Sequence, residues 1–139
     1  MSKLTVDVLT PQSKIYEGEA DIVIAPTVNG EIGILPGHVS LLTQIMPGEL
    51  QVKNSGKTSY VAIFGGYLEV SGNHVNILGD SAMRAEDIEI AKVEQAKERA
   101  EKAMKEKVSA EDLANIQGEL AKNILQLKVA RRHRDRRIQ

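Results

Sequence analysis

Apolar and polar residues alternate in short runs through the first 84 positions of the chain. The runs LTVDVL, ADIVIA, ELQVK, TSYVAIF, YLEV and HVNIL are rich in β-branched residues. Turn residues separate them, as in NSGK and SGN, where Asn and Gly accept the positive φ of a tight hairpin. Many short strands at this spacing, with no helical pattern between them, predict an antiparallel β-sandwich or barrel.

From residue 85 to residue 139 the apolar period becomes helical, with one Gly and no Pro. Two apolar stripes are present. The loose one is Ile88, Ala91, Ala96, Ala100, Ala103 or Met104, and Val108, and the cleaner one is Leu113, Ile116, Leu120, Ile124 and Leu127. Ser109 with Asp112 resembles a capping box and predicts the start of a second helix. The short join predicts an antiparallel hairpin, in which facing Ala residues let the backbones approach closely.

The expected fold class is therefore α+β, with an N-terminal antiparallel β-sandwich at 1–84 and a C-terminal antiparallel two-helix hairpin at 85–139. The narrow, Ala-rich stripes of the hairpin bury little area at about 25 cal/mol per Å². Such a hairpin needs a surface to lie on, and it can move if two partners offer that surface in turn. A plain helical cap on the sandwich is the equal alternative.

Composition removes several classes of site. The chain has no Cys, so disulfides and thiolate metal sites are excluded, and its three His are far apart in sequence, which gives a metal site little support. The N-terminus lacks the apolar region of a signal peptide, and no apolar run is long enough to span a bilayer. We expect a soluble, intracellular protein.

The stretch NGEIGILPGHVSLL, residues 29–42, concentrates candidate chemistry. His38 and Ser40 have no acid at a spacing that would orient the imidazole, and Glu31 is the only carboxylate, so neither a nucleophilic triad nor paired-carboxylate chemistry is indicated. The glycine spacing matches no phosphate-binding loop. A structural turn and a rigid, partly apolar docking edge remain as interpretations.

Four motifs in this order carry a family resemblance: GEIGILPGHVSLL, FGGYLEV, VNIL and AMRAEDI. They are similar to the motifs of the epsilon subunit of rotary F-type ATP synthases, and the similarity covers the whole chain. The resemblance implies a non-catalytic subunit of the central stalk, whose sandwich binds the γ subunit and the c-ring and couples ion-driven rotation to ATP synthesis. It places the contact with γ and the c-ring in the matching motif, at Glu31, Gly33, Leu35, Pro36, His38 and Leu42.

The resemblance also implies a regulatory role for the hairpin, which in an extended state rises along γ into the catalytic head of α and β subunits and blocks ATP hydrolysis. The last helix ends in a mostly cationic segment, here called the arginine tip: Arg131, Arg132, Arg134, Arg136 and Arg137. In the family its target is an acidic loop of the β subunit, which arginines can bind through paired hydrogen bonds. The alternatives are a solvated, frayed terminus or an anion-binding patch. Nucleic acid is not an expected partner, because the aromatic residues or module that it needs are missing.

Some family members bind ATP on the folded hairpin through the motif [IL]-D-x-x-R-A. Here the corresponding positions are Ile88, Glu89, Lys92 and Val93, and Arg99 and Lys122 stand where the family has further arginines. Lys lacks the bidentate fork of Arg. We therefore expect no cofactor, with ATP bound weakly or not at all.

Two other classes stay open on the sequence alone: an adaptor protein of sandwich plus hairpin unrelated to the synthase, and a small enzyme using His38 with Ser40 or Glu31. With no transit segment before Leu4, the resemblance favours the cytoplasmic face of a bacterial cell membrane, with attachment only through the complex.

Overall fold

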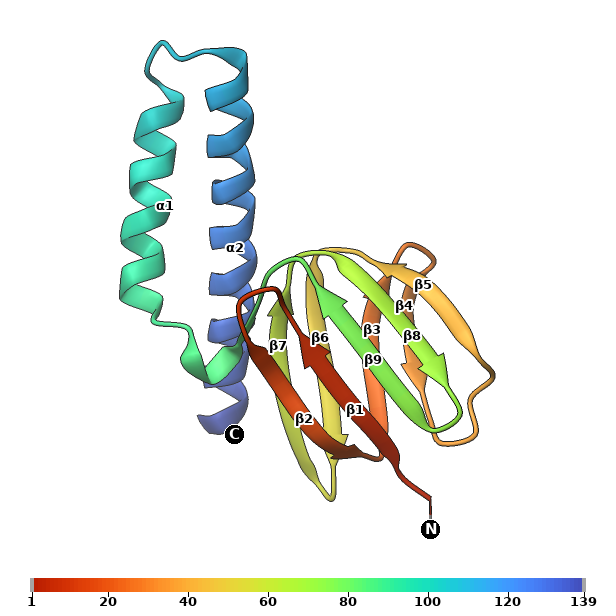
Figure 1. Cartoon of the computed structure of the whole chain (residues 1–139). Coiled ribbons are helices and arrows are strands. Elements are labelled where there is room, and N and C mark those ends of the chain that lie inside the picture. The colour runs from red at the N-terminus through yellow and green to blue at the C-terminus, as the bar shows by residue number, and fades with distance from the viewer. Residues whose placement is uncertain (1, 139) are drawn as a thin grey trace. The chain divides into compact units, whose positions relative to one another are not determined.

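The computed structural model describes residues 2–138, except for the side chains of residues 137 and 138. The chain divides between Arg84 and Ala85 into two compact units, one of strands and one of helices. Figure 1 labels the elements. The strands are β1 Leu4–Leu9, β2 Lys14–Ala20, β3 Ile22–Thr27, β4 Gly30–Ile34, β5 Leu41–Ile45, β6 Gly48–Asn54, β7 Lys57–Ile63, β8 Gly66–Ser71, β9 His74–Gly79 and β10 Ala82–Arg84.

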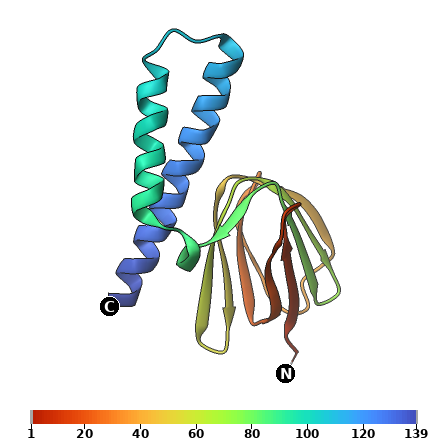
Figure 2. The ribbon, with the colours of Figure 1, turned by 60° about the vertical axis from the view of Figure 1, so that its left-hand side comes forward.

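The strands form one sheet in the order β10-β7-β6-β3-β5-β8-β9-β1-β2, with β4 paired to β3. This sheet folds over on itself into the two layers of a sandwich (Figures 1 and 2). The core between the layers consists of Val, Ile, Leu and Ala side chains on the inward positions of the strands, such as Leu50, Leu68 and Ile77. The predicted sandwich is confirmed.

One pairing differs from the expected antiparallel pattern: β1 runs parallel to β9. A long connection separates these two strands in sequence, so no tight hairpin forces them to be antiparallel. The sequence also gave no prediction for β2, β4, β5 or β10. In β4 the sequence GEIGI contains two glycines, which lower strand propensity, but pairing with β3 holds this segment extended.

The second unit begins with a 3₁₀ turn, η1 Ala85–Asp87, followed by α1 Ile90–Met104 and α2 Ala110–Ile138. The two helices lie side by side and antiparallel in Figures 1 and 2, as predicted. The N-cap prediction is also confirmed, because the Asp112 backbone N–H donates to Ser109 Oγ at 3.1 Å. Within residues 2–138, no helix is both long enough and apolar enough to cross a bilayer.

Candidate docking face and helical hairpin

Strands β5, β8 and β9 present three large apolar side chains to solvent. Leu42, Tyr67 and Leu78 are 70%, 58% and 57% exposed, whereas Leu68 and Ile77 lie in the core and Leu41 packs against it. Because side chains alternate along a strand, these three point outward as a direct result of the register that buries the core. Adjacent exposed apolar side chains of this size mark an interaction surface.

The strand register brings these side chains together with two polar ones. Leu42 lies opposite Glu69, and Glu69 lies opposite Asn76 on the next strand, while Tyr67 lies opposite Leu78 in the neighbouring row. The five residues line an open hollow of about 210 Å³. We call them the docking face: Leu42, Tyr67, Glu69, Asn76 and Leu78.

The structure spreads the six predicted contact residues over two strands and a turn. Glu31 and Gly33 lie exposed on β4, opposite Pro26 and Ile24 of β3. Three more of the predicted residues, Leu35, Pro36 and His38, lie in the turn that follows β4. Only Leu42, on β5, belongs to the docking face.

Hydrogen bonds hold this turn in place. The His38 backbone N–H donates to the carbonyl of Leu35 at 3.1 Å, and His38 Nδ1 lies 2.7 Å from the carbonyl of Val39. The Gly37 N–H donates to Asn73 Oδ1 at 2.8 Å, which ties the turn to the β8–β9 hairpin. Leu35 is 56% exposed, so the turn adds an apolar side chain to the surface.

Sequence reasoning missed Tyr67 and Leu78, although each carried a signal. In YLEV the alternation that buries Leu68 and Val70 requires Tyr67 to point outward. In VNIL the apolar pair Ile77-Leu78 breaks the alternation, so one of the two must face solvent. Both could have been found by looking for apolar residues at the strand positions that alternation assigns to solvent.

The stripes differ from the prediction in both helices. Ala91 on α1 is exposed, and Val108 is exposed in the join before α2, whereas Ala96 and Ala100 are partly buried. On α2 the prediction fails at one position. Ile124 is 48% exposed, and Asn123 is 7% exposed in its place. The inward stripe of α2 is therefore Leu113, Ile116, Leu120, Asn123 and Leu127, in alternating steps of three and four, which is the spacing of a coiled-coil seam.

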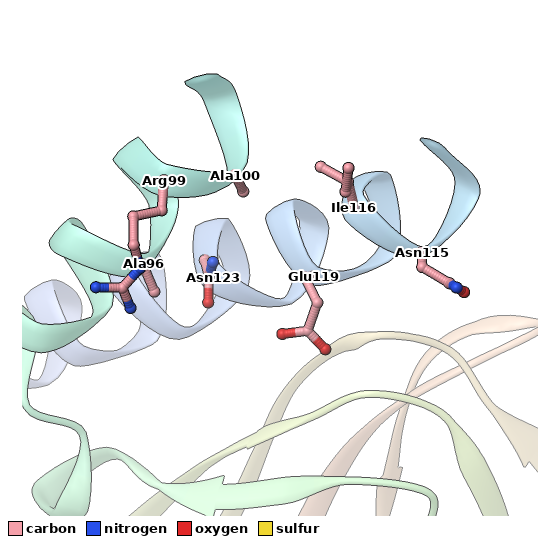
Figure 3. Close-up of a pocket in the computed structure, with 7 residues that line it drawn as sticks. All are labelled: Ala96, Arg99, Ala100, Asn115, Ile116, Glu119 and Asn123. Carbon is pink, nitrogen blue, oxygen red and sulfur yellow. The ribbon is translucent and has the colours of Figure 1, made fainter. Parts of the chain in front are cut away.

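The two helices pack against each other, and an open groove lies between them in their middle. Ala96, Arg99 and Ala100 of α1 and Asn115, Ile116, Glu119 and Asn123 of α2 line an open cavity of about 340 Å³ (Figure 3). No side chain of α1 is buried, so this interface removes little apolar area from water and contributes little to the stability of the hairpin.

One member of the arginine tip joins the two helices. Arg131 on α2 forms an ion pair with Glu94 on α1, with both side chains about half exposed. Arg134 Nε lies 3.7 Å from its neighbour Asp135 Oδ1. Arg132 is exposed and Arg136 is half-buried, while the side chain of Arg137 lies outside the described part of the chain.

The residues of the degenerate ATP motif lie just before α1, on α1 and on α2. Ile88 is buried after η1, and Glu89 precedes α1 and forms an ion pair with Lys92 at 3.0 Å. Arg99 lines the cavity between the helices, and Lys122 does not. Nothing in the described residues groups three or more His, Asp or Glu side chains in a way that could hold a metal ion.

Polar contacts lie along and between the strands of the sandwich. His74 Nε2 on β9 lies 2.9 Å from Asp7 Oδ2 on β1, and Lys14 forms an ion pair with Glu17 of the same strand at 2.8 Å. The hydrogen bond that Lys14 donates to Glu17 raises the pKa of Lys14. At the chain's N-terminal end, the Ser55 N–H donates to Asp21 at 2.7 Å and Lys3 pairs with the same carboxylate at 3.2 Å. The Ser55 hydrogen bond, followed by Lys3, lowers the pKa of Asp21.

Comparison with known protein families matches almost the whole chain. Residues 3–85 match the β-sandwich domain of the ATP synthase delta/epsilon chain, and residues 86–131 match its long α-helix domain.

Individual relatives give the same result. The chain is 39% identical to the ATP synthase epsilon chain of Alkalilimnicola ehrlichii, over 98% of each chain. It is 42% identical to that of a Janthinobacterium species, over 96% of this chain and 97% of the other. Among solved structures, a chain in the mitochondrial ATP synthase of Euglena gracilis, in a complex of OSCP, F1 and c-ring, aligns with a TM-score of 0.69 at 27% identity, covering 90% of this chain and 78% of that one. A chain of the central stalk and c-ring of the Tetrahymena thermophila enzyme has the same fold, with a TM-score of 0.61 at 15% identity.

Proposed function

This chain belongs to the epsilon-chain family of ATP synthases, and we propose that its sandwich docks on the γ subunit and the c-ring while its helical hairpin inhibits ATP hydrolysis. In this role the chain is a non-catalytic part of the rotor. It transmits rotation of the c-ring to the catalytic head, on the cytoplasmic face of a bacterial membrane. Family membership removes the adaptor unrelated to the synthase from consideration.

The observation that carries the docking proposal is the exposed apolar docking face. Three large apolar side chains on regular strands lie on a surface that the folded chain does not cover. The solved relative in the Euglena complex comes from an assembly that contains the c-ring, which supports a rotor contact. We assign the docking face to γ, and Glu31, Gly33 and the turn at Leu35, Pro36 and His38 to the junction of γ with the c-ring.

The hairpin has the features of an element that opens. No side chain of α1 is buried and the inward stripe of α2 includes Asn123, so little apolar burial opposes separation of the helices. A partly exposed ion pair such as Arg131–Glu94 contributes about 0–1 kcal/mol. Several arginine–carboxylate pairs with an acidic loop of the β subunit would exceed that, and about 5.5 kcal/mol of differential binding shifts a two-state equilibrium from 1:99 to 99:1.

ATP is not the proposed regulator of this hairpin. Lys92 forms an ion pair with Glu89, and neither residue lines the cavity that contains Arg99. We expect calorimetric titration of the full chain with Mg-ATP to give no binding in the micromolar range, and micromolar affinity would contradict this assignment.

ATP hydrolysis by the matching head of α, β and γ subunits tests the proposal. Three additions are compared: the full chain, a chain ending at Ala85, and a full chain in which Arg131, Arg132, Arg134 and Arg136 are replaced by Gln. We expect the full chain to inhibit hydrolysis, and the other two to bind the head with the same affinity but without inhibition.

The outcomes separate the two parts of the proposal. If all three forms bind and none inhibits, the sandwich is a coupling element and the hairpin has no inhibitory role. If the full chain does not bind the head, the docking assignment is wrong. If the truncated chain still inhibits, inhibition resides in the sandwich.

A further inference from the structure

Glu69 is the one charged residue in the docking face, where it stands among large apolar side chains. Further along the same layer, Asp7 on β1 lies 2.9 Å from His74, and Glu17 on β2 pairs with Lys14 at 2.8 Å. For the Glu69 side chain, the described part of the chain offers neither a hydrogen bond nor an ion pair. Its carboxylate is therefore hydrated by water in the free protein.

When a partner covers the docking face, the Glu69 carboxylate loses its water, and this loss costs free energy. Leu42 stands beside it on β5, and Tyr67, two residues earlier on β8, and Leu78, diagonally across on β9, line the same hollow. A partner that packs on these apolar side chains excludes the water that hydrates the carboxylate. A carboxylate left unpaired in a desolvated site weakens binding strongly, so a fitting partner must supply a cation at this position.

The walls of the hollow favour arginine over lysine as that cation. Its volume of about 210 Å³ is that of roughly seven water molecules at about 30 Å³ each, enough for one long side chain to enter. A guanidinium is weakly hydrated and stacks on aromatic rings such as Tyr67, whereas an ammonium keeps its water. The Asn76 amide, opposite Glu69, offers a carbonyl for a further N–H of the guanidinium.

We propose that the docking partner inserts an arginine into the hollow between Leu42, Tyr67 and Leu78, and that Glu69 is the carboxylate that binds it. This inference rests on the proposed docking function and adds the chemistry of the partner's contact. It makes Glu69 a specificity-determining residue, because apolar packing alone would accept any hydrophobic surface.

The test measures the affinity of the full chain for the head of α, β and γ subunits. Glu69→Gln keeps the shape of the side chain and removes its charge, and we expect it to raise Kd at least tenfold. Glu19→Gln is the matched control, since Glu19 is an exposed strand carboxylate of the same layer outside the hollow, and its Kd should stay within twofold. Raising NaCl from about 0.05 to about 0.5 M should weaken the wild type more than Glu69→Gln, because the lost interaction is ionic.

A scan of the arginines and lysines of γ, each replaced by Gln, identifies the partner residue. One replacement should weaken binding as much as Glu69→Gln and cause no further loss when the two are combined. Coupling of Glu69 to a lysine instead would overturn the choice of arginine.

Leu42→Ser separates the failure of this inference from the failure of the docking proposal. If Leu42→Ser weakens binding and Glu69→Gln does not, the docking face is right and the carboxylate anchor is wrong. If neither substitution changes Kd, the partner does not bind this face and the docking proposal is wrong.

Discussion

Gly66 opens β8 at a point where the backbones of β8 and β9 come unusually close, and its replacement by Ala tests that contact. The residue has φ +133°, in a region that side chains rarely adopt. A Cβ there would lie 2.1 Å from the carbonyl oxygen of Leu78 and 2.8 Å from the Cα of Gly79, whereas ordinary contact begins at 3.4 Å. Both obstacles are backbone atoms, so no side-chain rotation relieves the clash.

The loss of stability expected for Gly66→Ala has two contributions. A positive φ at a residue with a side chain costs about 1–3 kcal/mol. The strands must also separate, which weakens one or two ladder hydrogen bonds around the Gly66–Gly79 pair at about 1 kcal/mol each. We therefore expect Gly66→Ala to lower the free energy of unfolding of the sandwich by about 2–5 kcal/mol, a large part of the stability of a small domain.

Urea denaturation followed by tyrosine fluorescence measures this quantity in the full chain. Tyr16, Tyr60 and Tyr67 all lie in the sandwich and the chain has no Trp, so the signal reports that unit alone. With an m-value of about 2 kcal/mol per M, the midpoint should fall by roughly 2 M. Gly72→Ala is the control: it has φ +61° but nothing within 4 Å of an added Cβ, so it should cost about 1 kcal/mol. Equal losses in the two variants would refute the argument from close approach.

Two further predictions concern the cross-link at Asp21 and the cap of α2. Because the pKa of Asp21 is lowered in the folded chain, its carboxylate stabilises the fold above the unfolded-state pKa, and this contribution is lost as pH falls through the folded value. Between about pH 5 and pH 2 the urea midpoint of the wild type should therefore fall more steeply than that of Asp21→Asn, and parallel pH profiles would contradict the assignment. Ser109→Ala removes the acceptor for the Asp112 N–H and should cost about 1 kcal/mol of helix stability in far-UV circular dichroism, while Ser109→Asp should cost little; equal loss in both variants would show that the hydroxyl does not act as a cap.

The local features of this chain could be read from its sequence because they depend on neighbours in the chain. Strands such as Leu4–Leu9 and His74–Gly79 alternate apolar and polar residues, and that alternation follows from strand geometry alone. The N-cap at Ser109 depends on a residue three positions away. The family resemblance rested on motifs of the same local kind, and the matched domains at 3–85 and 86–131 confirm it.

The tertiary structure decided which of several equivalent residues face one another. Positions 123 and 124 flank the stripe of α2 almost symmetrically, since each residue turns the helix by about 100°, and only the placement of α1 selects Asn123 over Ile124. The segment Gly30–Ile34 is held extended by β3, a partner that its own glycines do not predict.

The docking face has the same origin. Leu42, Tyr67 and Leu78 come from three strands whose register is set by burial of the core on the opposite side of the sheet. Each residue alone is an ordinary apolar position in a strand. Their meeting around Glu69 depends on long-range strand pairing, which no local pattern encodes, because pairing partners are chosen by the free energy of the whole core.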